Sequence, residues 1–311
     1  MSMKKTTVVI GGGTMGADIA LTLARAGHPT HLVEPDPACR GSLPGRLAAG
    51  LAKLGCPQGL ERIALNAALG EVPWARVDAV IEAIPEDLAL KRRVFAELVR
   101  LAPPRALLTS NSSALPISAI GEGLATRERM FGLHYFMPAH SVPLVEVVCS
   151  DASDAALADE LCAFMRTTGK VPVKVRKDVP GFLANRLQHA LCREAFAMID
   201  AGIVTPEEVD LAVRFSFGFR YLAVGPMLQR DHAGLDVHCA AAATIYPSLC
   251  NDAEPAEVLR RHVADGHLGI KAGRGLFDWT PEKIAAEKRR YDTLLQGALK
   301  LIAAELPPIA P

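Results

Sequence analysis

Four polar residues follow or interrupt apolar segments of the 311-residue chain. They are His134 at the end of RMFGLH, Glu146 within LVEVV, Ser113 at the end of SNSS, and Asn185 within FLANRL. A histidine can take the proton of a secondary alcohol because its pKa lies near neutral pH. A buried carboxylate on its far ring nitrogen would fix the tautomer and stabilise the imidazolium. A serine hydroxyl and an asparagine amide could hold the alkoxide-like oxygen while a hydride leaves for a nicotinamide.

Each of these residues also has an ordinary structural explanation when it is considered alone. A histidine after an apolar strand is usually a core or surface residue, and serine or asparagine after a strand commonly forms a turn. Only the fold can bring the four side chains together.

A dinucleotide site is indicated near the N-terminus by TTVVIGGGTMGADIALTLARAGHPTHLVE. Gly11, Gly13 and Gly16 follow an apolar strand at the G-x-G-x-x-G spacing. Gly11 permits the tight turn, Gly13 lets the backbone approach a pyrophosphate, and Gly16 lets the helix pack on the strand. Thr14 and Met15 complete the predicted phosphate-binding turn, because the N-terminus of the following helix attracts anions.

The nature of the dinucleotide is indicated by Glu34. Gly27 and Pro29 end the helix, so the next strand is expected over Thr30 to Glu34. A carboxylate at the end of this strand can accept hydrogen bonds from the ribose diol of an adenosine, and it would repel a 2′-phosphate. The predicted cofactor is therefore NAD and not NADP.

The elements that must position these residues alternate between strand and helix up to residue 175. We expect strands at 6–10, 30–34, 79–84, 106–109, 130–134, 144–148 and 171–175. One or two short helices are expected between Asp36 and Arg76, and a helix from Pro85 to Leu101 that packs through Leu90, Val94, Leu98 and Leu101 with Lys91 on another face. This alternation predicts an α/β fold with a Rossmann-like, doubly wound and mostly parallel sheet.

The character of the chain changes at Asp178. Further helices are expected over 183–201, from a capped start at Thr205, and over 226–244, 255–265 and 281–301. We therefore predict a NAD-binding Rossmann domain over residues 1–179 and an all-helical C-terminal domain over residues 180–311.

The composition excludes several classes of partner. Lys plus Arg and Asp plus Glu both number 34, so no overall field favours nucleic acid or an acidic membrane surface. The chain has no run of 18 apolar residues and no signal-like N-terminus, which favours a cytoplasmic protein. Its cysteines and histidines lack metal-ligand spacing, so we expect no metal.

A series of motifs resembles the 3-hydroxyacyl-CoA dehydrogenase family over nearly the whole length. They are VIGGGTMGADIA, VIEAIPEDLALKRRVF, TSNSSALPIS, GLHYFMP, PLVEVV, DVPGFLANRL and GIKAGRGLF. The resemblance implies that His134 is the catalytic base, that Glu146 is its partner, and that Ser113 and Asn185 lie at the reacting oxygen of the substrate. It also implies that Glu86, Lys91, Asn111 and Lys271 lie near the NAD. The helical domain over residues 180–311 is then expected to bind substrate and to form a homodimer.

Three departures from the family pattern concern the substrate. Met137 replaces the usual asparagine of H-F-F-N-P, and the stretch from Glu34 to Asp78 is short and contains a single lysine, Lys53. The segments NRLQHALCREAF and FGFRYLAVGP resemble the branch that contains L-gulonate 3-dehydrogenase, lambda-crystallin and a pyridine-carboxylate dehydrogenase. These departures favour a small carboxylated hydroxy substrate, whose acidic group Arg220 could bind in a bidentate way.

Two alternatives remain open at this stage. One is an L-3-hydroxyacyl-CoA dehydrogenase acting on substrates such as 3-hydroxybutyryl-CoA, and the other is a non-catalytic structural protein that binds NAD. Arg220 could equally be a surface or dimer-interface residue. Arg230, Asp231 and His232 form a polar cluster without an assigned role.

Overall fold

The computed structural model describes residues 4–309, which form two compact units. The first unit runs to Asn185 and includes the terminal segment from Ala303, and the second spans Arg186–Ile302. The domain boundary expected after residue 179 stays a prediction.

The first unit is built on an eight-stranded sheet in the order β3-β2-β1-β4-β5-β6-β7-β8. The strands are β1 Thr7–Ile10, β2 Thr30–Val33, β3 Ile63–Asn66, β4 Ala79–Glu82, β5 Leu107–Ser110, β6 Met130–Tyr135, β7 Leu144–Cys149 and β8 Val171–Val175. All neighbouring strands are parallel except the antiparallel pair β6 and β7. The predicted Rossmann-like sheet is confirmed, and its strand order reverses between β1 and β4, which is where such sheets bind dinucleotides.

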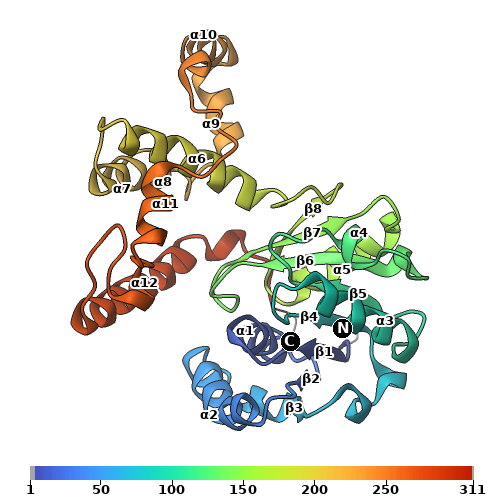
Figure 1. The fold of residues 1–311 in the computed structure, drawn as a ribbon. Helices are drawn as coiled ribbons and strands as arrows, with labels where there is room; N and C mark the ends of the chain where they lie inside the picture. Colours follow the sequence, from blue (N-terminus) through green and yellow to red (C-terminus); the bar gives the residue numbers. More distant parts are fainter. Residues whose placement is uncertain (1–3, 310–311) are drawn as a thin grey trace. The chain divides into compact units, whose positions relative to one another are not determined.

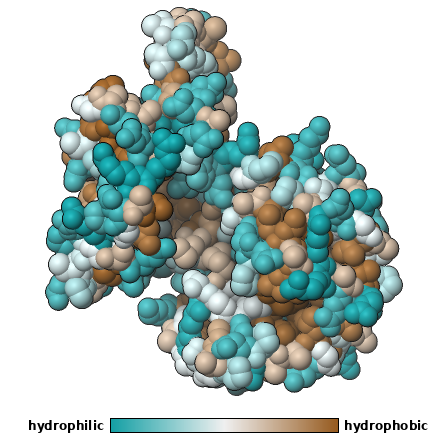
Figure 2. Space-filling view, in the orientation of Figure 1, coloured by the Kyte–Doolittle hydropathy of each residue, from teal (hydrophilic) through white to brown (hydrophobic). Residues whose placement is uncertain are grey.

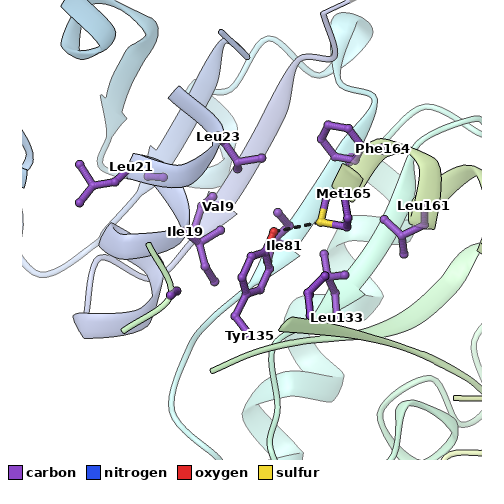
Figure 3. Close-up of a cluster of buried hydrophobic side chains, with 14 of the residues drawn as sticks. Val9, Ile19, Leu21, Leu23, Ile81, Leu133, Tyr135, Leu161, Phe164 and Met165 are labelled. Carbon is purple, nitrogen blue, oxygen red and sulfur yellow. Dashed lines mark hydrogen bonds between the residues drawn. The ribbon is translucent and has the colours of Figure 1, made fainter. Parts of the chain in front are cut away.

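Helices cover both faces of this sheet (Figure 1). They are α1 Thr14–Arg25, α2 Pro37–Lys53, α3 Leu88–Leu101, α4 Ile117–Ile120 and α5 Ala155–Thr167. Because both faces are covered, the central strands are buried along their whole length, as in TVVI of β1, and they are rich in apolar residues. Figure 3 shows one buried cluster, in which Val9, Ile81 and Leu133 lie near α1 and α5 and the hydroxyl of Tyr135 is 3.1 Å from the sulfur of Met165.

The expectation for residues 36–76 was wrong in two respects. In place of one or two short helices there is one 17-residue helix, α2, and the sequence analysis missed the strand β3. Helix α2 forms despite its internal Pro44 because Leu43, Leu47 and Leu51 are buried along one face. Strand β3 is short and only partly buried, since it pairs at the sheet edge with β2 alone.

The second unit is helical, as predicted. Its helices are α6 Ala184–Asp200, which begins in the first unit, α7 Pro206–Phe215, α8 Phe217–Arg220, α9 Pro226–Ala233, α10 Leu235–Ile245, α11 Glu257–Ala264 and α12 Pro281–Leu301. Thr205 and Glu208 form the expected capping box of α7. Between residues 186 and 302 only isolated β-bridges occur, at Gly269–Arg274 and Arg274–Asp278.

Short 3-10 turns complete the described chain. They are Pro57–Arg62, Leu69–Glu71, Trp74–Arg76, Arg127–Arg129, Tyr246–Ser248, Ile270–Ala272 and Ala303–Glu305. Within residues 4–309, none of the helices has the length and apolar character needed to cross a membrane.

Candidate active site

The glycine turn after β1 has the geometry that a pyrophosphate requires. Gly11 has φ +99°, and a Cβ there would lie 2.7 Å from the carbonyl oxygen of Ala83. A Cβ on Gly16 would lie 1.8 Å from the carbonyl oxygen of Gly11, so only glycine permits this helix start. The space beside Gly13 is open, and no side chain caps the N-terminus of α1. The backbone N–H groups of Thr14 and Met15 in the first turn can therefore hold phosphate oxygens.

Glu34 follows β2 and lies directly beside this turn. Its Oε2 atom accepts a 2.7 Å hydrogen bond from the N–H of Gly12, and Oε1 accepts one of 2.9 Å from Asp36. The side chain is 9% exposed. Because each carboxylate oxygen has further acceptor capacity, Glu34 can hold the ribose diol of an adenosine while closing the turn.

His134 and Glu146 form the central pair of the site. They are direct partners across β6 and β7, and Nδ1 of His134 lies 2.8 Å from Oε2 of Glu146. Both side chains are buried, at 3% and 0% exposure. A carboxylate can only accept here, so Nδ1 carries the proton and Nε2 is left free to accept one.

The other ring nitrogen faces the loop after β5. Nε2 of His134 lies 3.2 Å from Oγ of the exposed Ser113. Asn185 approaches the same loop, with Nδ2 3.5 Å from the carbonyl oxygen of Ser113. Asn111 fixes the loop to β6, because its Oδ1 accepts a 2.9 Å hydrogen bond from the N–H of Tyr135. The fold thus brings together the four side chains that the sequence singled out.

Glu146 has a second set of partners in the linker after β8. Its Oε1 accepts hydrogen bonds from the N–H groups of Leu183 and Ala184, at 3.1 and 2.7 Å. Phe182 of the same linker is buried, has φ +51°, and places its ring 5.6 Å from the ring of His134. The carboxylate that orients the imidazole therefore also anchors the first turn of α6.

A buried ionic network supports the loop that carries Ser113. Lys91 donates to Oε1 of Glu82 at 2.7 Å and lies 3.4 Å from Glu86, although it had been expected outside the packed face of α3. That expectation was wrong: Lys91 is 1% exposed and lies on the buried face with Phe95 and Leu98, because β4 presents the Glu82 carboxylate there. A buried ammonium requires such a partner.

Glu86 shapes the loop directly. One of its oxygens accepts hydrogen bonds from Oγ of Ser112 and from the N–H groups of Ser113 and Ala114. Burial opposes ionisation of this carboxyl, but the hydrogen bonds from Ser112, Ala114 and Leu115 and the charge of Lys91 outweigh it and lower its pKa. Glu86 and Lys91 both lie at the switch point between β1 and β4.

The remaining candidates belong to the helical unit. Arg220 ends α8 and is exposed, and Lys271 is an exposed residue of the turn Ile270–Ala272. Arg230, Asp231 and His232 all lie in the last turns of α9.

Comparison with known protein families shows which family the chain belongs to. Residues 6–179 match the 3-hydroxyacyl-CoA dehydrogenase NAD binding domain, and residues 181–279 match the 3-hydroxyacyl-CoA dehydrogenase C-terminal domain. The chain belongs to the 3-hydroxyacyl-CoA dehydrogenase family. The predicted NAD cofactor and the assignment to NAD-dependent dehydrogenases are thereby confirmed.

Members of the family with different substrates resemble this chain to a similar degree. It is 30% identical to 5-formyl-3-hydroxy-2-methylpyridine 4-carboxylate 5-dehydrogenase of Mesorhizobium japonicum, over 91% of this chain and 94% of that protein. It is 34% identical to 3-hydroxyadipyl-CoA dehydrogenase of Escherichia coli, over 90% of this chain and 60% of that protein. A crystal structure of the pyridine carboxylic acid dehydrogenase, described as an NAD⁺-dependent dismutase, superposes with a TM-score of 0.89 and covers 96% of this chain and 99% of that one.

In this 3-hydroxyacyl-CoA dehydrogenase family member, the sequence did not indicate the residues that contact and position the site residues. Glu82 hydrogen-bonds Ser110 at 2.6 Å, and Ser112 hydrogen-bonds Glu86. Phe136 places its ring 4.4 Å from that of His134. The one available signal was Glu82 itself, since an acidic residue inside the apolar run AVIEAI needs a buried cation.

Proposed function

We propose that the protein oxidises the hydroxyl-bearing carbon of a small carboxylated hydroxy acid with NAD, and catalyses the reverse reaction. The observation that carries this proposal is the arrangement of His134. Its Nδ1 is held 2.8 Å from Glu146, and its Nε2 faces Ser113 at the carboxyl edge of the sheet. This edge, next to the β1–β4 switch point, is where substrates meet a bound dinucleotide.

In the proposed reaction His134 acts as the general base. Its Nε2 takes the proton of the substrate hydroxyl, and Glu146 stabilises the imidazolium that results. Ser113 and Asn185 donate hydrogen bonds to the oxygen as negative charge develops on it. NAD, when bound, would supply the hydride acceptor. Gly11 to Gly16 would hold its pyrophosphate, and Glu34 would hold its adenosine ribose.

The arginines of α2 are bonded within the chain, and this favours a compact substrate over a thioester of CoA. Arg40 donates to the carbonyl oxygens of Glu34 and Pro35, at 2.7 and 3.1 Å. Arg46 donates to the carbonyl oxygens of Gly13 and Thr14 and to Asp18. Both guanidinium groups are thus engaged within the chain, which leaves few cations on this helix for the phosphates of CoA. Arg220 is our candidate for binding the substrate carboxylate.

The second candidate function is an L-3-hydroxyacyl-CoA dehydrogenase. It is favoured by the 32% identity to the probable 3-hydroxybutyryl-CoA dehydrogenase of Bacillus subtilis, over 88% of this chain and 97% of that protein. The third candidate function is that of a non-catalytic protein that binds NAD.

One screen separates the three functions. NADH formation is followed with free 3-hydroxy acids, hydroxymethyl pyridine carboxylates, gulonate and 3-hydroxybutyryl-CoA, each against His134→Gln as control. A higher kcat/KM for a free acid supports the proposal. A higher value for the CoA thioester would establish the second function, and NAD binding without turnover of any substrate would favour the third.

We further propose a cytoplasmic homodimer that associates through the helical unit. Helix α10 is apolar on nearly every side, yet Leu235, Val237 and Ile245 are 62%, 61% and 50% exposed. Figure 1 shows α9 and α10 extending away from α6, α7 and α11, and Figure 2 shows hydrophobic residues on their surface. A helix that is apolar all round is normally covered. Sedimentation of the protein and of Val237→Glu tests this, and a monomeric wild-type protein at all concentrations contradicts it.

A further inference from the structure

Lys170 is a buried cation outside the site described above. It immediately precedes β8, and its side chain is 4% exposed. Its Nζ donates to the carbonyl oxygens of Ala139 and Val142, at 2.5 and 2.6 Å. Neither acceptor is a carboxylate, so the ammonium is buried without a directly bonded counter-ion. Burial of a charge costs free energy, so we asked what the hydrogen bonds of Lys170 hold in place.

Both acceptors lie in the loop of residues 136–143 that joins β6 to β7, between His134 and Glu146. The same loop contacts α1 at two further points. Oγ1 of Thr22 donates a hydrogen bond to the carbonyl oxygen of Ala139 at 3.4 Å. Nδ1 of His140 lies 3.1 Å from Oδ2 of Asp18, without the geometry of a hydrogen bond. Lys170 and α1 therefore hold the loop from two sides.

Helix α1 is the element whose N-terminus forms the phosphate-binding turn. Arg46 extends the connection to that turn, because it contacts Asp18 at 3.2 Å and the carbonyl oxygens of Gly13 and Thr14. A continuous set of polar contacts thus runs from Lys170 through the loop and Asp18 to the residues that hold the pyrophosphate.

We propose that Lys170 is a positioning residue of the dehydrogenase reaction, whose ammonium holds the 136–143 loop against α1 and so fixes His134 relative to the bound cofactor. This inference rests on the proposed function, in which His134 is the base. An error of about 1 Å in the distance between base, substrate and cofactor can cost on the order of a hundred-fold in rate.

The electrostatic surroundings of Lys170 make the proposal testable by pH. Burial is the main cause that lowers its pKa to about 8, the charge of Arg25 lowers it further, and the charge of Asp18 raises it. The ring of Tyr135 on β6 also faces it, with its centroid 6.0 Å from Nζ, and His140 lies in the same loop as the two carbonyl acceptors. Above this pH the amine is neutral, and its hydrogen bonds to the two carbonyls lose their charge assistance.

The decisive experiment is the pH dependence of kcat in three variants. Arg25→Gln removes a positive charge, so the alkaline decline of kcat should move to higher pH than in the wild-type protein. Asp18→Asn removes a negative charge, so the decline should move to lower pH. Both variants retain Lys170. Lys170→Met should lower kcat by about ten-fold or more, with no decline of its own near pH 8.

Lys174→Met is the matched control, because Lys174 lies on β8 in a salt bridge with Asp159. A second readout is the ¹⁵N signal of the His134 imidazole, which should broaden or shift in Lys170→Met and stay unchanged in Lys174→Met. If the wild-type enzyme is active and both charge variants keep the wild-type pH profile, the role of Lys170 is disproved while the proposed function stands. A wild-type protein inactive with every substrate of the screen would instead overturn the proposed function.

Discussion

His134 and Glu146 lie directly opposite each other in the antiparallel register of β6 and β7, with Nδ1 2.8 Å from Oε2. Residues paired in this way project from the same face of the sheet with their Cβ atoms about 5 Å apart. The distance between the proposed base and its partner is therefore set by backbone hydrogen bonds between β6 and β7.

Replacing His134 should abolish most turnover without weakening NAD binding. Positioned proton transfer is typically worth ~10² to 10⁴ in rate, and His134→Gln should lose at least that factor in kcat. The NAD affinity, measured by fluorescence titration, should stay close to that of the wild-type protein. His31→Gln on β2 is the control. Substantial activity in His134→Gln would mean that another group is the base.

Glu146→Gln should reduce kcat less than His134→Gln, because it removes only the group that orients the base. It should also destabilise the fold. The amide can present its oxygen either to His134 or to the N–H groups of Leu183 and Ala184, so some buried donors lose their acceptor. A loss of about 1 to 3 kcal/mol in the free energy of unfolding is expected in urea titrations. Glu160→Gln, at an exposed position of α5, should show no such loss.

Glu34 should account for the preference for NAD over NADP. A 2′-phosphate would lie against its carboxylate, whose oxygens are already held by Gly12 and Asp36. Glu34→Ala should therefore narrow the ratio of the two dissociation constants, mainly by weakening NAD binding. Equal affinities of the wild-type protein for both cofactors would contradict this explanation.

Arg220→Ala tests the proposed carboxylate contact. Loss of a charge-assisted hydrogen bond should cost about 1.5 to 3 kcal/mol, or roughly ten-fold to a hundred-fold in kcat/KM for a free hydroxy acid. Arg220→Lys should retain only part of the wild-type kcat/KM, because an ammonium cannot reproduce a bidentate contact. Unchanged kinetics in Arg220→Ala, together with preference for 3-hydroxybutyryl-CoA, would favour the acyl-CoA function.

His28 should make the stability of the fold sensitive to acid. Burial, followed by the charge of Lys4, lowers its pKa from 6.5 to about 4, and its Nδ1 accepts a hydrogen bond from the N–H of Lys5. The unfolded chain therefore binds a proton at higher pH than the folded protein does. The contribution of His28 to the free energy of unfolding is fully present above pH 6.5. It is lost as the pH falls from 6.5 to about 4, by about 3 kcal/mol in total.

Urea denaturation of wild-type protein and of His28→Gln at several pH values measures this contribution. The glutamine oxygen can accept the hydrogen bond from Lys5 but does not titrate. The free energy of unfolding should therefore fall by about 3 kcal/mol less between pH 6.5 and 4 than it does in the wild-type protein. His31→Gln should retain the wild-type dependence. The same slope in His28→Gln and wild-type protein would show that other groups cause the acid sensitivity.

The sequence by itself determined the features that depend on local pattern. The glycine spacing, the apolar strands and the acid at Glu34 identified the nucleotide-binding half. The amphipathic stretch 281–301 predicted α12, which spans Pro281–Leu301 and is capped by Thr280. These signals are reliable because strand burial, helix capping and tight turns are decided by residues near one another in the chain.

The tertiary structure decided what depends on partners distant in the chain. Lys91 is buried because β4 presents Glu82, and β3 forms because β2 offers an edge. Lys170 precedes a strand with nothing in its sequence to indicate that it holds the loop after His134. Contacts of this kind follow from the order and direction of the strands, which a local pattern of hydrophobicity does not encode.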